Sequence, residues 1–306
     1  MKKLVELCFF VVLTAGILTH SSLSLAYAAL GLELWYEKMV PVLLPFLILS
    51  GTLIRMGLVP GLIRPIQPIF AKIFRLSPQA VYVILTGFLC GFPMGARTIA
   101  DFRNRQELSI EEGQYLLAFC NNLGPVYFLG FVLPLLQKQR ILPYLAGMYG
   151  IPLAYGLLLR YTVYREKIIA APDNGKGENG VCPKPLLDAL DESVTAAGHN
   201  ILQLGGYMIF FNLLNLLPAI FFTDSYRYAP LLEISGGLQL LGSRYPLYTL
   251  LLLPAGGLSC LVQTGSCIRG TGLSLANYFL HKMILTGLTG LYYLGWFLLF
   301  PDTFLL

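Results

Sequence analysis

Composition places this chain of 306 residues among integral membrane proteins. Hydrophobic residues make up 56% of it, charged residues only 12%, and the mean hydropathy is +0.68, whereas soluble domains carry about 25% charged residues. The net charge of +5 comes from basic residues scattered between apolar runs, a pattern typical of orientation signals rather than of a nucleic-acid-binding face. The six cysteines show no CxxC motif and no metal-ligand spacing with the histidines, so we predict no disulfide framework, metal or cofactor.

Residues 1–35 are predicted to contain the first transmembrane span. Two lysines, an apolar run over 7–18 and small residues at 26–28 also resemble a cleaved signal peptide. Both interpretations are open at this point. We favour an uncleaved span because further spans follow, and in either case the amino end is expected in the cytoplasm.

The rest of the chain predicts five further crossings and two re-entrant hairpins. A polar turn is expected at 33–38, an interfacial segment at 60–76 and an amphipathic lead-in at 186–197. The crossings are expected at 40–58, 110–136, 141–164, 201–222 and 273–300. Apolar runs at 78–96 and 245–262 contain glycine and proline breaks. If both runs return to the side from which they came, most lysines and arginines fall in cytoplasmic segments, so we predict hairpins and two cytoplasmic termini.

Two motifs interrupt the apolar pattern of the first half. Residues 91–97 read GFPMGAR, and residues 120–125 read CNNLGP within the crossing that a capping box at Ser109 and Glu112 should begin. Pro125 cannot donate a hydrogen bond to the carbonyl of Asn121. Irregular backbone at membrane depth must be buried in protein or line a wet cavity, so both motifs are candidate sites.

A constant offset aligns the two halves and predicts an inverted repeat. It places Gly91 on Gly256, residues 108–109 on 273–274, and Tyr127 on Tyr292. An odd number of predicted crossings separates the hairpins, so they should enter from opposite faces, as in transporters that bind substrate between two repeats. The predicted organisation is a span at 1–35, a first repeat at 36–164, a cytoplasmic linker at 165–187 and a second repeat at 188–300.

The motifs at 91–97, 119–130 (FCNNLGPVYFLG) and 256–266 (GGLSCLVQTGS) resemble the nucleoside-recognition, or Gate, domain proteins, and among these the YlbJ-type sporulation integral membrane proteins. The resemblance covers about 35–300. It implies a multi-pass cell-membrane protein needed for spore formation, with a fold similar to the gate portion of concentrative nucleoside transporters. Leu123 stands where many relatives carry a serine or threonine, so hydroxyl coordination is not predicted there.

The candidate substrate-binding residues come from the breaks and from the matching motif of the second half: Gly91, Pro93, Gly95, Asn121, Asn122, Ser259, Gln263 and Thr264. The alternative role of the glycines is close helix packing, and that of the asparagines is hydrogen bonding between helices. Glu233 is a candidate for a proton or cation route, although a water-exposed interfacial position is favoured. Lys282 is expected to snorkel to the interface together with His281. Arg97 is expected to serve topology or lipid phosphate.

Two functional classes follow from this pattern. The favoured one is a carrier or channel that moves a small polar solute, nucleoside-like or other, across the lipid bilayer during sporulation. The other is a non-transporting scaffold that recruits partners during spore assembly, either other sporulation membrane proteins or copies of itself. An enzyme is not expected, because no nucleophile, metal or general-base constellation is apparent.

Overall fold

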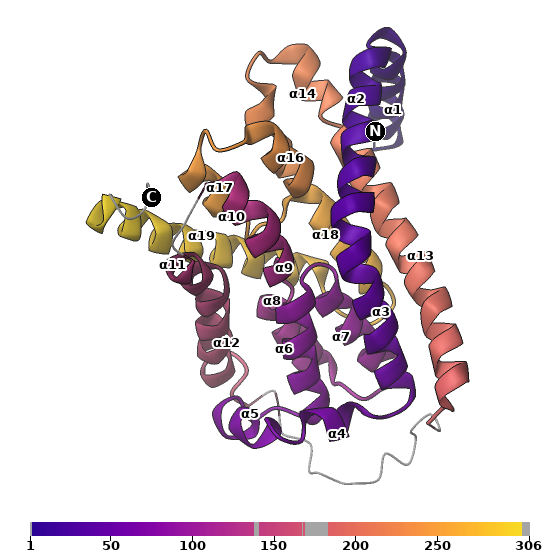
Figure 1. Ribbon diagram of the computed structural model, residues 1–306, viewed down its shortest axis with the longest axis vertical. Helices are drawn as coiled ribbons and strands as arrows, with labels where there is room; N and C mark the ends of the chain where they lie inside the picture. Colours follow the sequence, from indigo (N-terminus) through magenta and orange to yellow (C-terminus); the bar gives the residue numbers. More distant parts are fainter. Residues whose placement is uncertain (1, 138–140, 167, 169–182, 302–306) are drawn as a thin grey trace.

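The described part of the chain contains only helices as regular elements (Figure 1). This computed structural model describes residues 2–137, 141–166, 168 and 183–301, so most of the predicted linker lies outside the described residues. Six segments are long and apolar enough to cross a membrane: Ser21–Arg55, Ile110–Leu135, Leu142–Tyr161, Leu186–Phe221, Pro246–Cys267 and Leu275–Leu299. A bent helix pair would raise this number to seven. The predicted all-helical, polytopic class is confirmed.

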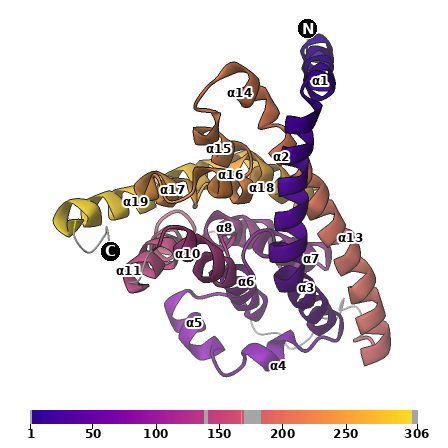
Figure 2. The same cartoon turned by 45° about the horizontal axis from the view of Figure 1, so that its top comes forward.

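A long antiparallel pair of helices forms one side of the molecule (Figures 1 and 2). Its first member is continuous from α2 (Ser21–Leu34) through the π-helical η1 (Trp35–Met39) to α3 (Val40–Arg55). The expected turn at 33–38 is therefore wrong, since η1 carries its polar residues without breaking the helix. Its second member is α13 (Leu186–Leu213). A Cβ at Gly31 would lie 2.8 Å from the Cα of Ile209, so glycine permits this close approach. The expected lead-in at 186–197 belongs to this same helix.

The first hairpin consists of α6 (Pro78–Cys90) and α7 (Met94–Asn104). Thr86 donates a hydrogen bond of 3.3 Å to the hydroxyl of Thr98, which joins the two arms. The 13 residues of α6 span about 20 Å, too short for a hydrocarbon layer of about 30 Å. Before it lie α4 (Val59–Ile63) and α5 (Gln67–Ile73), and α5 meets α6 at 99°.

The broken crossing is confirmed. Helix α8 (Ile110–Cys120) begins at Ser109, whose hydroxyl accepts a hydrogen bond of 3.0 Å from the amide of Glu112. Only this half of the predicted capping box forms, because the Glu112 carboxylate instead accepts a 2.8 Å bond from the Ser77 hydroxyl. The helix stops at Cys120, and the chain continues through α9 (Pro125–Tyr127), η2 (Phe128–Val132) and α10 (Leu133–Leu135). The next crossing contains α11 (Leu142–Leu145), η3 (Ala146–Gly150) and α12 (Ile151–Tyr161).

The second half differs from the expectation. After α14 (Leu216–Phe221), η4 (Ser225–Arg227), α15 (Ala229–Leu232) and α16 (Ile234–Leu241), the chain forms α17 (Pro246–Leu252) and α18 (Gly257–Cys267). These last two helices are interrupted as predicted, but together they make one candidate span of 22 residues. The predicted second re-entrant hairpin is therefore not seen in this segment.

The last helix, α19 (Leu275–Leu299), runs crosswise to α3 and α13 (Figures 1 and 2). Its start lies against the start of α8, where the Gln114 side chain accepts a 2.7 Å bond from the amide of Ser274 and donates a 3.3 Å bond to its carbonyl. Residue 274, which the repeat offset equates with residue 109, thus lies beside the first part of α8. The inverted arrangement of the two halves is not seen among the described residues.

Candidate functional site

The two breaks of the first half pack backbone against backbone. Gly91 has a φ of +82°, and a Cβ there would lie 2.2 Å from the amide nitrogen of Gly124. A Cβ at Gly95 would lie 2.7 Å from the carbonyl oxygen of Cys120. Both glycines thus allow a contact that a side chain would block. Gly91 and Gly95 therefore have the alternative role named above, close helix packing, and neither lines one of the hollows described below.

Asn121 holds the break to two distant helices. Its side-chain amide donates to the hydroxyl of Thr264 on α18 at 2.9 Å and to that of Tyr278 on α19 at 3.2 Å. Its side-chain oxygen accepts a 3.3 Å bond from the amide of Ala96 on α7. The side chain is completely buried. Asn121 and Thr264 therefore meet each other, and their hydrogen bonds fix the positions of three elements.

Asn122 is bound to a buried lysine. Its side-chain oxygen accepts a 2.9 Å hydrogen bond from Nζ of Lys282, which also donates to the carbonyl of Asn121. Lys282 is 1% exposed, and its neighbour His281, 8% exposed, lies 2.6 Å from the hydroxyl of Tyr155. The expectation that both residues snorkel is therefore wrong. Lys282 lies two turns inside α19, and the carbonyl left free before Pro125 provides an acceptor for it there.

Helix α18 brings together the candidates of the second half. Gln263 donates a 2.7 Å bond to the hydroxyl of Ser259, one turn earlier. Ser259 is fully buried and Gln263 is 5% exposed. The turn before α18 also meets the first hairpin, because a Cβ at Gly256 would lie 3.0 Å from the ring of Phe92. The predicted residues of both halves therefore converge around the turn at 91–93.

Glu233 is buried, not exposed to water as favoured from the sequence. It is 2% exposed and caps α16, where its carboxylate accepts bonds from the amides of Ser235 (3.1 Å) and Gly236 (2.7 Å). The side chain of Asn212 on α13 donates a third, at 3.0 Å. Backbone donors at a helix start stabilise a carboxylate, which explains how the acid is accommodated. Among the described residues, no group of three or more histidine, cysteine, aspartate or glutamate side chains could hold a metal ion.

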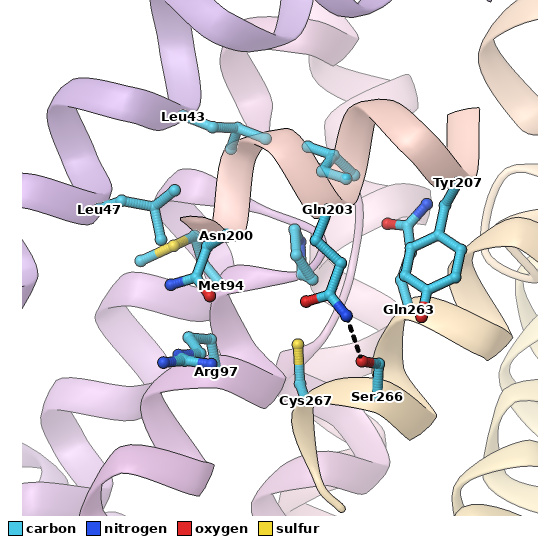
Figure 3. Close-up of a pocket in the computed structure, with 12 residues that line it drawn as sticks. Leu43, Leu47, Met94, Arg97, Asn200, Gln203, Tyr207, Gln263, Ser266 and Cys267 are labelled. Atoms are coloured by element: carbon cyan, nitrogen blue, oxygen red, sulfur yellow. Dashed lines mark hydrogen bonds between the residues drawn. The ribbon is translucent and has the colours of Figure 1, made fainter. Parts of the chain in front are cut away.

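Three hollows lie where α3 and α13 face the hairpin. The central hollow is bounded by the turn of the hairpin, α3, α13 and α18, and Figure 3 shows Gln203 bonded to Ser266 across it at 2.9 Å. Its lining residues with polar side chains are Arg97, Asn200, Gln203, Tyr207, Gln263 and Ser266. Pro93 lines it as well. Amide, hydroxyl and guanidinium groups thus surround a space between four elements.

The other two hollows adjoin the central one at opposite ends. The Glu233 hollow, lined also by Lys38 and Ser235, shares Gln263 with the central hollow. The Asp101 hollow, lined also by Arg55 and Ser193, shares Arg97 and Asn200 with it. The lining residues of α3 advance from Leu43 to Leu47 across the central hollow, while those of α13 run backwards from Tyr207 to Asn200. The three hollows therefore follow one another along the antiparallel pair, and we call this line the α3/α13 seam.

Comparison with known proteins identifies the domain that contains the first half of this site. Residues 37–129 match the family model "Gate: Nucleoside recognition". The chain carries a Gate domain. Over 232 residues it is 30% identical to the sporulation integral membrane protein YlbJ of Bacillus subtilis (strain 168), an alignment that covers 71% of this chain and 57% of the relative. The chain thus spans just over half the length of that relative, and no solved structure matches it. The predicted resemblance is confirmed, and the chain is a multi-pass integral membrane protein.

The Gate domain supplies only part of the site. The match includes α3, the first hairpin and the break after α8, whereas α13, α18 and α19 lie outside it. Four site residues were not predicted as such from the sequence: Lys282, which was expected to snorkel, and the α13 residues Asn200, Gln203 and Tyr207. A signal for Lys282 was present, since an ionisable residue within an apolar span is a functional candidate by default. The α13 residues carried no comparable signal, because single polar residues in a span also serve helix packing.

Proposed function

We propose that this protein moves a small polar solute across the cell membrane along the α3/α13 seam. The observation that carries the proposal is the order of the three hollows, which extends from Lys38 to Arg55 on one helix and from Met208 to Ser193 on the other. Seventeen residues of helix rise about 26 Å, close to the hydrocarbon thickness of about 30 Å. The line of hollows therefore has about the length that a route across a bilayer requires, and the proposal needs no inverted repeat.

The groups of the central hollow favour an uncharged solute with several hydrogen-bonding groups. Asn200, Gln203, Gln263 and Ser266 offer both donors and acceptors. The one charged group there, Arg97, lies 3.4 Å from the carboxylate of Asp101, so its charge is balanced. A nucleoside has this chemistry, in keeping with the name of the matched family. Gln263 is the group we assign to solute recognition, because it alone among these residues lines both the central hollow and the Glu233 hollow.

Substitution of Gln263 tests the proposal. In proteoliposomes loaded with a panel of nucleosides and other small polar solutes, Gln263→Leu is expected to lower flux of the transported solute about tenfold, the effect of one lost hydrogen bond of about 1.4 kcal/mol. Gln239→Leu is the matched control, because Gln239 is exposed on α16 and lines none of the three hollows. It should leave flux unchanged.

Two outcomes contradict the assignment in different ways. Equal flux by wild type and Gln263→Leu would remove Gln263 from the route. A wild-type protein that moves none of the solutes, together with normal sporulation by a host carrying Gln263→Leu, would favour the scaffold that recruits partners during spore assembly. The requirement for sporulation is itself a proposal for this chain, since it comes from the name of the relative.

We also propose that the Asp101 end of the seam faces the cytoplasm. The segment between α3 and α8 carries Arg64, Lys72, Arg75, Arg103 and Arg105, and an excess of basic residues marks cytoplasmic segments. Single cysteines at 103–105 should therefore react with a membrane-impermeant thiol reagent only from the cytoplasmic face, and reaction only from outside would reverse the orientation. The side on which the two termini lie stays a prediction.

A further inference from the structure

The ammonium group of Lys282 lies in a site made of neutral oxygen atoms. Its two hydrogen-bond acceptors are the backbone carbonyl of Asn121 and the side-chain oxygen of Asn122, the latter at 2.9 Å. The ring centroids of Phe92 and Tyr278 lie 4.7 Å and 5.6 Å from Nζ. Carbonyl oxygens released by a broken helix are also the groups that coordinate alkali cations within membrane transporters. The two oxygen atoms and the two rings around Nζ therefore have the chemistry of a monovalent cation site, and the lysine ammonium group fills this site.

No carboxylate among the described residues offsets this charge directly. Lys282 forms no ion pair with any described acidic residue, although it is 1% exposed. A buried charge without a counter-ion is costly unless local dipoles and hydrogen bonds stabilise it. Here the carbonyl end of α8, which stops at Cys120, supplies the negative end of a helix dipole, and the two rings supply cation–π contacts. These features are arranged around the position of the charge.

Lys282 also connects three parts of the site: the turn of the first hairpin, the break after α8 and, through Asn121, helix α18. It belongs to α19, its acceptors lie at the break after α8, and Phe92 lies in the turn of the hairpin that lines the Glu233 hollow. Asn121, whose carbonyl it binds, reaches α18 through Thr264. A cation at this point therefore holds together the turn, the break and the helix that carries Gln263.

We propose that Lys282 is a tethered cation that takes the place of a bound alkali ion at the break after α8. The inference rests on the proposed transport function, because it assigns to this site the role of a coupling-ion site without a free ion. Its consequence is that the wild-type protein needs no sodium or potassium there, whereas removal of the side chain leaves an oxygen-lined site that a small monovalent cation can enter.

The test measures cation binding and needs no transported solute. Thermal unfolding of the detergent-purified protein is compared in sodium, potassium, lithium and choline chloride at equal ionic strength. The wild type should have the same Tm in all four salts. Lys282→Ala should unfold at a lower temperature in choline than in at least one alkali salt, by about 3 °C or more, the change that about 1 kcal/mol of binding produces in a protein of this size.

Two further variants separate cation binding from a loss of packing. Lys282→Met fills the space with an uncharged chain, so it should lose stability equally in all salts. Lys72→Ala removes an exposed lysine of α5 and should behave as wild type. A wild-type protein stabilised by one alkali cation would overturn the proposal, as would a folded Lys282→Ala protein with equal Tm in every salt. If Lys282→Ala does not fold in any salt, Lys282→Thr replaces it under the same criterion. A failure of the flux experiment on Gln263 leaves this result unaffected.

Discussion

Gly87→Ala is expected to lower the Tm of the purified protein by about 5–10 °C. A Cβ at position 87 would lie 2.2 Å from the carbonyl oxygen and 3.1 Å from the carbonyl carbon of Cys120. Both are backbone atoms at the end of α8, so they cannot rotate away as a flexible side chain would. Overpacking of this kind costs about 1–3 kcal/mol, and each kcal/mol shifts the Tm of a protein of this size by about 2–4 °C. A thiol-reactive dye can report the unfolding, because Cys90, Cys120 and Cys260 are buried and free.

Substitutions at two other glycines show whether the backbone collision causes the loss of stability. Gly206 in α13 has no atom within 4 Å of the Cβ position, so Gly206→Ala should unfold at the wild-type temperature or slightly above it. Gly91→Ala combines a collision at 2.2 Å with a φ of +82°, a conformation that costs other residues about 1–3 kcal/mol more. It should therefore be the least stable of the three. A Gly87→Ala protein as stable as Gly206→Ala would contradict the backbone contact between the hairpin and the break.

Arg160→Met is expected to destabilise the protein by about 3–5 kcal/mol. Arg160 is 4% exposed at the end of α12. Its guanidinium donates to five backbone carbonyls, those of Phe74 (2.8 Å), Tyr164 (2.9 Å), Ile168 (3.1 Å), Arg75 (3.3 Å) and Arg165 (3.4 Å). Methionine fills a similar volume but leaves these acceptors without their charged donor, and buried polar groups without partners are costly. The connection between α12 and the bend before α6 should loosen first.

The matched control is Arg165, the next arginine along the chain. The side chain of Arg165 is exposed, so Arg165→Met should unfold at nearly the wild-type temperature. Arg160→Lys should be intermediate, because a lysine keeps the charge but has only three donors and no planar fork. Equal thermal unfolding of Arg160→Met and Arg165→Met, measured with the same thiol-reactive dye, would refute the role of the carbonyl cluster.

Local chemistry made several elements predictable from the sequence. The turn at 91–93 and the break at 121–124 follow from glycine and proline residues that lie next to each other or two positions apart. Such close pairs weaken the hydrogen bonding of the same helical turn and interrupt the helix. The start of α8 follows from Ser109, whose hydroxyl satisfies an amide one turn along the chain. The turn expected at 33–38 was wrong because this segment contains polar residues but no proline. Polar residues alone do not break a helix, and the first member of the long helical pair continues through them.

The sequence by itself determined the class of protein, the positions of the two breaks in the first half and the resemblance to Gate-domain proteins, because composition and backbone chemistry are properties of short segments. Only the tertiary structure decided where the side chains of these segments lead. It joined Asn121 to Thr264, buried Lys282 against Asn122 and placed the start of α19 against the first part of α8. These contacts connect residues more than 140 positions apart, and their geometry depends on the packing of whole helices, which no local pattern encodes.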